Sequence, residues 1–101
     1  MKTINIMANK ENGNILDFAK SVNAPCLVLW SNNTFISTIH IDDVDYVDIS
    51  KVNETGLILV YINKLSYVVC KSICLLDLQN DIEYIYAYDE GEFYEEWNER
   101  F

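Results

Sequence analysis

One apolar run, Leu57 to Ile62, constrains the fold of this chain more than any other segment. Turn residues flank it on both sides, at Asn53 to Gly56 and at Asn63-Lys64. Six residues are too few to span a bilayer, which takes about 20. A short apolar run between two turns is typical of a buried strand. We therefore predict a central β-strand here.

Other segments also show the pattern of strands. Residues Ile82 to Tyr88 alternate, with tyrosines at 84, 86 and 88 on one face. In residues 65–78 a helical spacing competes with a high density of β-branched and aromatic side chains, and we favour strands. The remaining predicted strands are Thr3 to Ala8, Cys26 to Trp30, Thr34 to Ile41 and Val44 to Ile49. Of these, the second and third flank a Ser-Asn-Asn turn and predict a hairpin.

Two helices are predicted, one near each end of the chain. Ile15, Phe18, Ala19 and Val22 recur at helical spacing after the break at Asn12-Gly13-Asn14. Near the carboxyl end, Asp89 and Glu92 have the spacing of a capping box. Phe93, Trp97 and Phe101 then recur every four residues, which predicts an apolar stripe that packs on the sheet.

Together these patterns predict a single α+β domain over residues 1–101. Its core element would be an antiparallel sheet of five or six strands. An N-terminal helix and a C-terminal amphipathic helix would pack on that sheet. A length of 101 residues suits one core of this kind and is too short for two.

The net charge of −9 is concentrated in two acidic segments. Residues 42–54 carry five carboxylates against one lysine, and residues 77–101 carry nine carboxylates against one arginine. Such a surface repels nucleic acid and anionic membranes, and it attracts a basic protein. Two interpretations remain open for the carboxyl-terminal face: a solvated face that keeps the protein soluble, or a carboxylate array that imitates phosphates.

The helical spacing of the glutamates and the energetic cost of their repulsion favour a carboxylate array that imitates phosphates. Glu92, Glu95, Glu96 and Glu99 would share one helix face, where each like-charge pair costs roughly 0.2–0.5 kcal/mol. Solubility needs net charge, but it does not need this clustering. The predicted partner-binding residues are Asp42, Asp43, Asp45, Tyr88, Asp89, Glu90, Glu92, Glu95, Glu96, Trp97 and Glu99.

The sequence indicates no catalytic, cofactor or metal site. His40 is the single histidine and can pair with Asp42, but no nucleophile is placed beside it by sequence. Asp42, Asp43 and Asp45 lack the spacing of a calcium-binding EF-hand loop. The tyrosines at 84, 86 and 88 can stack nucleic-acid bases, but the surrounding acidity favours a covered sheet face or a protein-binding surface. We therefore predict that the chain is not an enzyme.

Compartment follows from the cysteines and from the first residues. Cys26, Cys70 and Cys74 are odd in number and lie in apolar surroundings, which is typical of reduced thiols in the cytoplasm. The first 14 residues show no apolar core of a secretory signal peptide.

In size, acidity and cysteine usage, the chain resembles the small acidic immunity proteins of bacterial toxin systems, such as those of contact-dependent growth inhibition. This resemblance implies an inhibitor that binds a basic toxin, a nuclease, and occludes its active site or nucleic-acid-binding surface. The chain is also similar to acidic phage proteins that block DNA-binding defence enzymes, and a non-catalytic interaction subunit is a third alternative.

Overall fold

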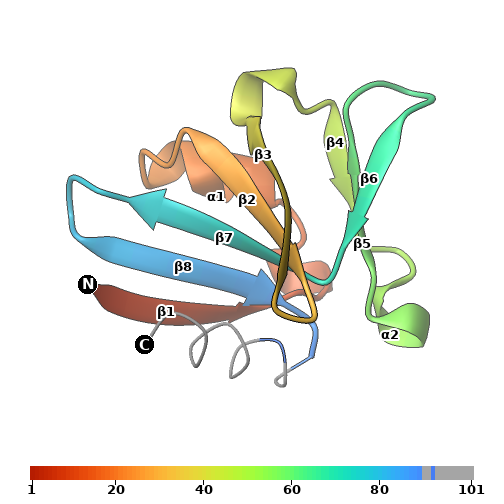
Figure 1. Cartoon of the computed structure of the whole chain (residues 1–101), viewed down its shortest axis with the longest axis horizontal. Helices are drawn as coiled ribbons and strands as arrows, with labels where there is room; N and C mark the ends of the chain where they lie inside the picture. The colour runs from red at the N-terminus through yellow and green to blue at the C-terminus, as the bar shows by residue number, and fades with distance from the viewer. Residues whose placement is uncertain (90–91, 93–101) are drawn as a thin grey trace.

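The computed structural model describes residues 1–89 and 92, and in them eight strands form two sheets (Figure 1). The first sheet has five strands in the order β1-β8-β7-β2-β3, and the second has three in the order β4-β5-β6. The strands are β1 (Lys2–Met7), β2 (Cys26–Ser31), β3 (Thr34–His40), β4 (Tyr46–Asp48), β5 (Ile58–Tyr61), β6 (Tyr67–Cys70), β7 (Ser72–Asp77) and β8 (Ile82–Ala87).

Short helices fill some of the connections. The α-helices are α1 (Ile15–Ser21) and α2 (Val52–Thr55), and the 3-10 helices are η1 (Lys10–Asn12) and η2 (Ile41–Asp43). The Asn14 side chain caps α1 by accepting a hydrogen bond from the Asp17 N–H, as the break at residues 12–14 indicated. The predicted first helix and the choice of strands for residues 65–78 are thus confirmed.

The predicted fold class, one antiparallel sheet with a helix packed on it near each end, is wrong. The strands divide into two sheets, and β1 pairs with β8 in parallel, with Lys2 opposite Ile82 and Met7 opposite Ala87. The physical reason is that period-two alternation fixes which way side chains point but not which strand is the partner. Here the first strand pairs with the last, so no local turn signal marks the contact. The predicted carboxyl-terminal helix and its apolar stripe begin beyond Asp89 and lie outside the described residues, apart from Glu92.

The two sheets meet where β6 continues into β7. Lys71 separates the two strands, and its N–H donates to the Trp30 carbonyl at 2.9 Å. A single bent ribbon therefore belongs to both sheets, pairing with β5 before the bend and with β2 and β8 after it. This bend sets the second sheet at an angle to the first (Figure 1).

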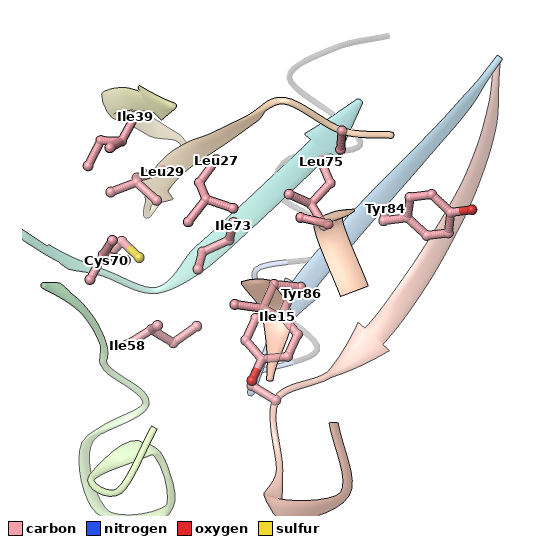
Figure 2. Close-up of a cluster of buried hydrophobic side chains, with 14 of the residues drawn as sticks. Ile15, Leu27, Leu29, Ile39, Ile58, Cys70, Ile73, Leu75, Tyr84 and Tyr86 are labelled. Atoms are coloured by element: carbon pink, nitrogen blue, oxygen red, sulfur yellow. The ribbon is translucent and has the colours of Figure 1, made fainter. Parts of the chain in front are cut away.

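One hydrophobic core serves both sheets (Figure 2). Ile58 and Cys70 come from the three-stranded sheet, and they face the same cluster as Leu29 and Ile73 of the five-stranded sheet. All four side chains are fully buried. The predicted strand over residues 57–62 is confirmed as β5, and it lies in the middle of its sheet with β4 and β6 on either side.

The inner face of β8 lies under α1. Tyr84 meets the ring of Phe18 edge-on, with the ring centroids 4.9 Å apart, and Tyr86 lies beside Ile15 (Figure 2). Both tyrosines are buried, so the alternating tyrosines form a covered face and not a platform for bases. Within the described residues, the Tyr86 hydroxyl has no hydrogen-bond partner. Burial raises the pKa of Tyr86 to about 12.

We expect Tyr86→Phe to raise the free energy of unfolding by about 1 kcal/mol at neutral pH, because it removes a buried hydroxyl that has no hydrogen-bond partner among the described residues. The effect should grow with pH. A tyrosine ionises near pH 10 in the unfolded chain but near 12 in the fold, so the wild type should lose about 2 kcal/mol between pH 9 and about pH 12. Urea unfolding at several pH values measures both effects.

The matched control for this prediction is Tyr88→Phe, two residues further along the chain, where the side chain is exposed. It should change neither the stability at neutral pH nor its slope with pH. A Tyr86→Phe protein that is less stable than wild type at pH 7 would show that the hydroxyl has a stabilising partner.

Candidate functional site

An open cleft of about 830 Å³ lies between the end of β3, the η2 turn and the β5–β6 turn. Figure 1 shows η2 and the β5–β6 turn at the same end of the molecule. Asp42, Asp43 and Asp45 line this cleft from one side, and Asn63 and Lys64 line it from the β5–β6 turn. We call it the acidic cleft.

Local hydrogen bonds hold the three aspartates at the cleft. The His40 side chain caps η2 by accepting from the Asp42 N–H at 3.1 Å. The η2 turn closes through the Val44 N–H, which donates to the Ile41 carbonyl. The Asp45 N–H then donates to the Tyr61 carbonyl at 2.7 Å, which ties the segment to β5. The carboxylates therefore sit on a braced backbone.

The electrostatics of the acidic cleft are negative. Asp42, Asp43 and Asp45 are exposed, and within residues 1–89 and 92 no lysine forms an ion pair with any of them. His40 Nδ1 lies 3.4 Å from Asp42 Oδ2, and both side chains are largely exposed. Because this nitrogen accepts the Asp42 N–H, it carries no proton to donate to the carboxylate, so the contact is not an ion pair. Three carboxylates against Lys64 leave an excess of negative charge that a cationic partner can neutralise.

His40 and Asp42 are in contact, as the strand pattern indicated, but the hydrogen bond joins the Asp42 backbone N–H to the His40 ring and not the ring to the carboxylate. In the described part of the chain, however, His40 hydrogen-bonds to Asp42 and to no hydroxyl or thiol. Because Nδ1 already accepts the Asp42 N–H, the ring acts as a helix cap. Nucleophilic catalysis would need a side chain activated by the histidine. The geometry favours binding, and the absence of enzymatic activity remains a prediction.

Among the described residues, no three histidine, cysteine or carboxylate side chains are grouped as the ligands of a metal ion would be.

The second predicted acidic segment is only partly described. Tyr88 and Asp89 directly follow β8, and both are exposed. Glu90, Glu95, Glu96, Trp97 and Glu99 lie outside the described residues, so the structure tests none of them. The acidic cleft adjoins β3, the edge strand of the five-stranded sheet, and two strands separate β3 from β8. No described contact brings Asp42, Asp43 or Asp45 next to Tyr88.

Glu92 was expected on an exposed acidic face, and that expectation is wrong for this residue. Its side chain is buried, at 3% exposure. Both carboxylate oxygens lie 3.3 Å from the Asn32 backbone nitrogen and accept its N–H. Asn32 and Asn33 both have positive φ, so the β2–β3 connection has the mirror-image geometry of tight hairpins. Glu92 thus secures a hairpin turn 60 residues away in sequence.

We expect Glu92→Ala to lower the free energy of unfolding by about 1–3 kcal/mol, because the Asn32 N–H loses a charged acceptor. Glu54→Ala, at an exposed carboxylate near the end of α2, is the matched control and should stay within about 0.5 kcal/mol of wild type. Equal stabilities of the two variants in urea unfolding would contradict a structural role for Glu92.

Sequence reasoning missed a row of three tyrosines across the second sheet. Tyr46 of β4 lies opposite Tyr61 of β5, and Tyr61 lies opposite Tyr67 of β6. The rings of Tyr46 and Tyr61 stack, with centroids 4.3 Å apart and planes at 9°. Those of Tyr61 and Tyr67 are 5.1 Å apart and tilted by 45°. We call this set the tyrosine row.

The tyrosine row adjoins the acidic cleft. Asp45 lines the cleft and directly precedes Tyr46, while Ile62 lines it and directly follows Tyr61. Partial desolvation raises the pKa of Tyr46. The neighbouring Tyr61 hydroxyl and the carboxylates of Asp48 and Asp45 raise it further. A signal was present in the sequence, since each tyrosine stands at a strand end beside a turn, but the row emerges only when the strand register is known.

Comparison with known proteins adds no relative: no family model, curated protein or solved structure matches this chain. Within the part of the chain that the structure describes, no helix has the length and apolar character needed to cross a membrane.

Proposed function

We propose that this protein is an immunity-type inhibitor that binds a basic toxin, a nuclease, and neutralises it by occlusion. The observation that carries the proposal is the acidic cleft, in which three exposed carboxylates line one open concavity. A nuclease must present cationic side chains to hold a phosphate backbone. A rigid surface that presents carboxylates in place of phosphates competes for those same side chains.

The braced backbone of the cleft supports this proposal. The backbone N–H groups of Asp42 and Asp45 are hydrogen-bonded to the His40 ring and to the Tyr61 carbonyl respectively. A backbone segment that is already fixed loses little conformational freedom on binding, so more of the interaction energy appears as affinity.

The net charge of −9 supports the same class of partner. Like charge disfavours nucleic acid as a ligand, and opposite charge accelerates association with a basic protein. The rate of association should therefore fall steeply as salt is added, because the Debye length shrinks from about 10 Å at 0.1 M to about 3 Å at 1 M.

The proposed compartment is the cytoplasm. None of the three cysteines, all within the described residues, forms a disulfide, and two of them are buried, as is usual for proteins kept in a reducing environment. An inhibitor in this compartment meets a nuclease toxin before it reaches cellular nucleic acid.

Affinity capture tests the proposal. The immobilised wild-type protein is exposed at low salt to an extract of the source organism, and bound proteins are released at high salt and identified. The matched bait is the triple variant Asp42→Asn, Asp43→Asn, Asp45→Asn, which keeps the shape of each side chain but removes its charge.

We expect a basic protein with nuclease activity to bind the wild type and to be absent from the triple variant. Its purified form should lose nuclease activity when the wild-type protein is added. Retention of the same protein by both baits would exclude the acidic cleft. A partner that is an intact DNA-binding defence enzyme would support the phage-type alternative, and a constitutive partner without nuclease activity would support an interaction subunit.

A further inference from the structure

The outer face of the three-stranded sheet is unusual for a solvent-facing surface. Side chains alternate along each strand, so Val47, Ile58 and Val60 point inward and the tyrosine row points outward. The next row on the outer face consists of Asp48, Leu59 and Val69. The outer face therefore carries five apolar or aromatic side chains and one carboxylate.

Much of this face is open to solvent. Tyr46 is 42% exposed, Tyr67 is 51% exposed and Val69 is 39% exposed. Ile62 and Leu65 in the adjoining turn extend the exposed apolar surface. Monomeric proteins seldom leave a contiguous apolar patch uncovered unless it binds something. Tyrosine is also among the residues that contribute most to binding energy at protein interfaces.

The chemistry of this face selects one kind of occupant. Aromatic ring faces attract cations, and arginine stacks flat on them better than lysine does. Asp45 directly precedes Tyr46, and Asp48 lies on the same strand face two residues after it. Both carboxylates can accept hydrogen bonds from a guanidinium group, Asp48 in addition to the Ser50 N–H that its Oδ1 accepts at 2.8 Å. Rings and carboxylates therefore lie within one patch, and both favour a guanidinium group.

Charge complementarity disfavours the other occupants. A nucleic acid offers bases that can stack on tyrosine, but its phosphates would meet Asp45 and Asp48. A second copy of this chain would place its own Asp45 and Asp48 next to those of the first copy, and these like charges would repel each other. Lys64 in the β5–β6 turn is a cation at one end of the patch, and it is outnumbered by Asp42, Asp43, Asp45 and Asp48 along the η2–β4 side.

We propose that the tyrosine row, flanked by Asp45 and Asp48, is a docking surface for an arginine-bearing segment of the protein partner. This inference rests on the proposed function, because it names the part of the basic partner that this second surface holds. The acidic cleft attracts the basic partner over a long range and sets the partner's position on this protein. The tyrosine row supplies desolvated contact area, and the arginine stems cover the exposed apolar side chains beside it.

Isotope-labelled protein titrated with two synthetic peptides tests this proposal. One peptide carries four arginines separated by serines, and the other carries lysines at the same four positions. We expect backbone shifts on β4, β5 and β6 with the arginine peptide, and at least 5-fold tighter binding than with the lysine peptide.

Variants assign the preference to the tyrosine row. Tyr46→Ser with Tyr67→Ser should weaken binding of the arginine peptide at least 5-fold and abolish the preference over lysine. Phe35→Ser, at an exposed aromatic on β3 outside the row, is the matched control and should bind both peptides as wild type does. Asp42→Asn with Asp43→Asn should weaken both peptides equally. Circular dichroism and thermal unfolding verify that each variant is folded.

Three outcomes would overturn the proposal. Equal binding of the two peptides, or shifts confined to the acidic cleft, would show that the tyrosine row is not the docking surface. The proposed inhibitor function would be unaffected by that result. Self-association that disappears in the double tyrosine variant would assign the face to a second copy. Binding of a single-stranded oligonucleotide at the row would assign it to nucleic acid. Failure of the proposed function would appear separately, as affinity capture without any basic partner.

Discussion

Reversing all three carboxylates of the acidic cleft, with Asp42→Lys, Asp43→Lys and Asp45→Lys, should weaken binding to the basic partner at least 100-fold. Close charge pairs across protein interfaces couple by about 1.5–7 kcal/mol each. Replacing a carboxylate by an ammonium group not only removes such a pair but sets like charges against each other. Stability should change little, because these three side chains are exposed.

The control for this variant must reproduce its change in net charge. Glu11→Lys, Asp17→Lys and Glu54→Lys together make the same change at exposed positions outside the cleft. This control should slow association modestly through the long-range field and leave dissociation unchanged. Surface plasmon resonance at several salt concentrations separates the two rates. Equal losses of affinity in both variants would mean that net charge, and not the cleft, drives binding.

Ile58→Ala should lower the free energy of unfolding by about 3 kcal/mol, within the usual range of about 2–5 for such truncations. Ile58 is fully buried in the middle strand of the second sheet and packs into the core that both sheets share (Figure 2). For a chain of this size, such a loss should lower the melting temperature by roughly 12–24 °C. It is a large part of the whole stability of a typical domain, about 5–15 kcal/mol.

The matched control is Ile62→Ala, at the exposed isoleucine just beyond the same strand. It should stay within about 0.5 kcal/mol of wild type. Both variants should unfold in one transition, because the core is continuous across the bend at Lys71. Two separate transitions in Ile58→Ala would show that the sheets fold independently and would contradict a shared core.

The positions of strands could be predicted from the sequence, because alternation and turn residues are local signals. The run at residues 57–62 became β5, and the segment predicted over residues 82–88 became β8, which ends at Ala87. Tyr84 and Tyr86 are buried as neighbours on one face, whereas Tyr88 lies beyond the strand and is exposed. The Ser-Asn-Asn turn became the β2–β3 connection. Each of these depends on residues that are neighbours in sequence.

The arrangement of strands could not be predicted in the same way. The parallel pairing of β1 with β8 joins residues about 80 positions apart, and no pattern within either strand names its partner. The division into two sheets depends on the bend at Lys71. No glycine or proline lies at this bend, so the sequence gives no local signal of it. These features are decided by tertiary packing, which overrides local preference.

In the candidate site, too, the features with a local sequence signal could be predicted, and those that depend on tertiary contacts could not. Asp42, Asp43 and Asp45 were found as a charge cluster in the sequence, and the structure brings them to one cleft. Glu92 fitted the pattern of an exposed face, yet its carboxylate is buried against a turn that helical periodicity cannot reveal. The tyrosine row needed the register of three strands before it could be seen.

Competition with nucleic acid for the basic partner tests whether the acidic cleft occludes the partner's nucleic-acid-binding surface. The basic partner is bound to a fluorescent oligonucleotide that it cannot cleave, and this protein is added while anisotropy is recorded. We expect displacement at a one-to-one ratio by the wild type and no displacement by the Asp42→Asn, Asp43→Asn, Asp45→Asn variant. Full retention of the oligonucleotide in a saturated complex with the wild type would contradict occlusion by the acidic cleft.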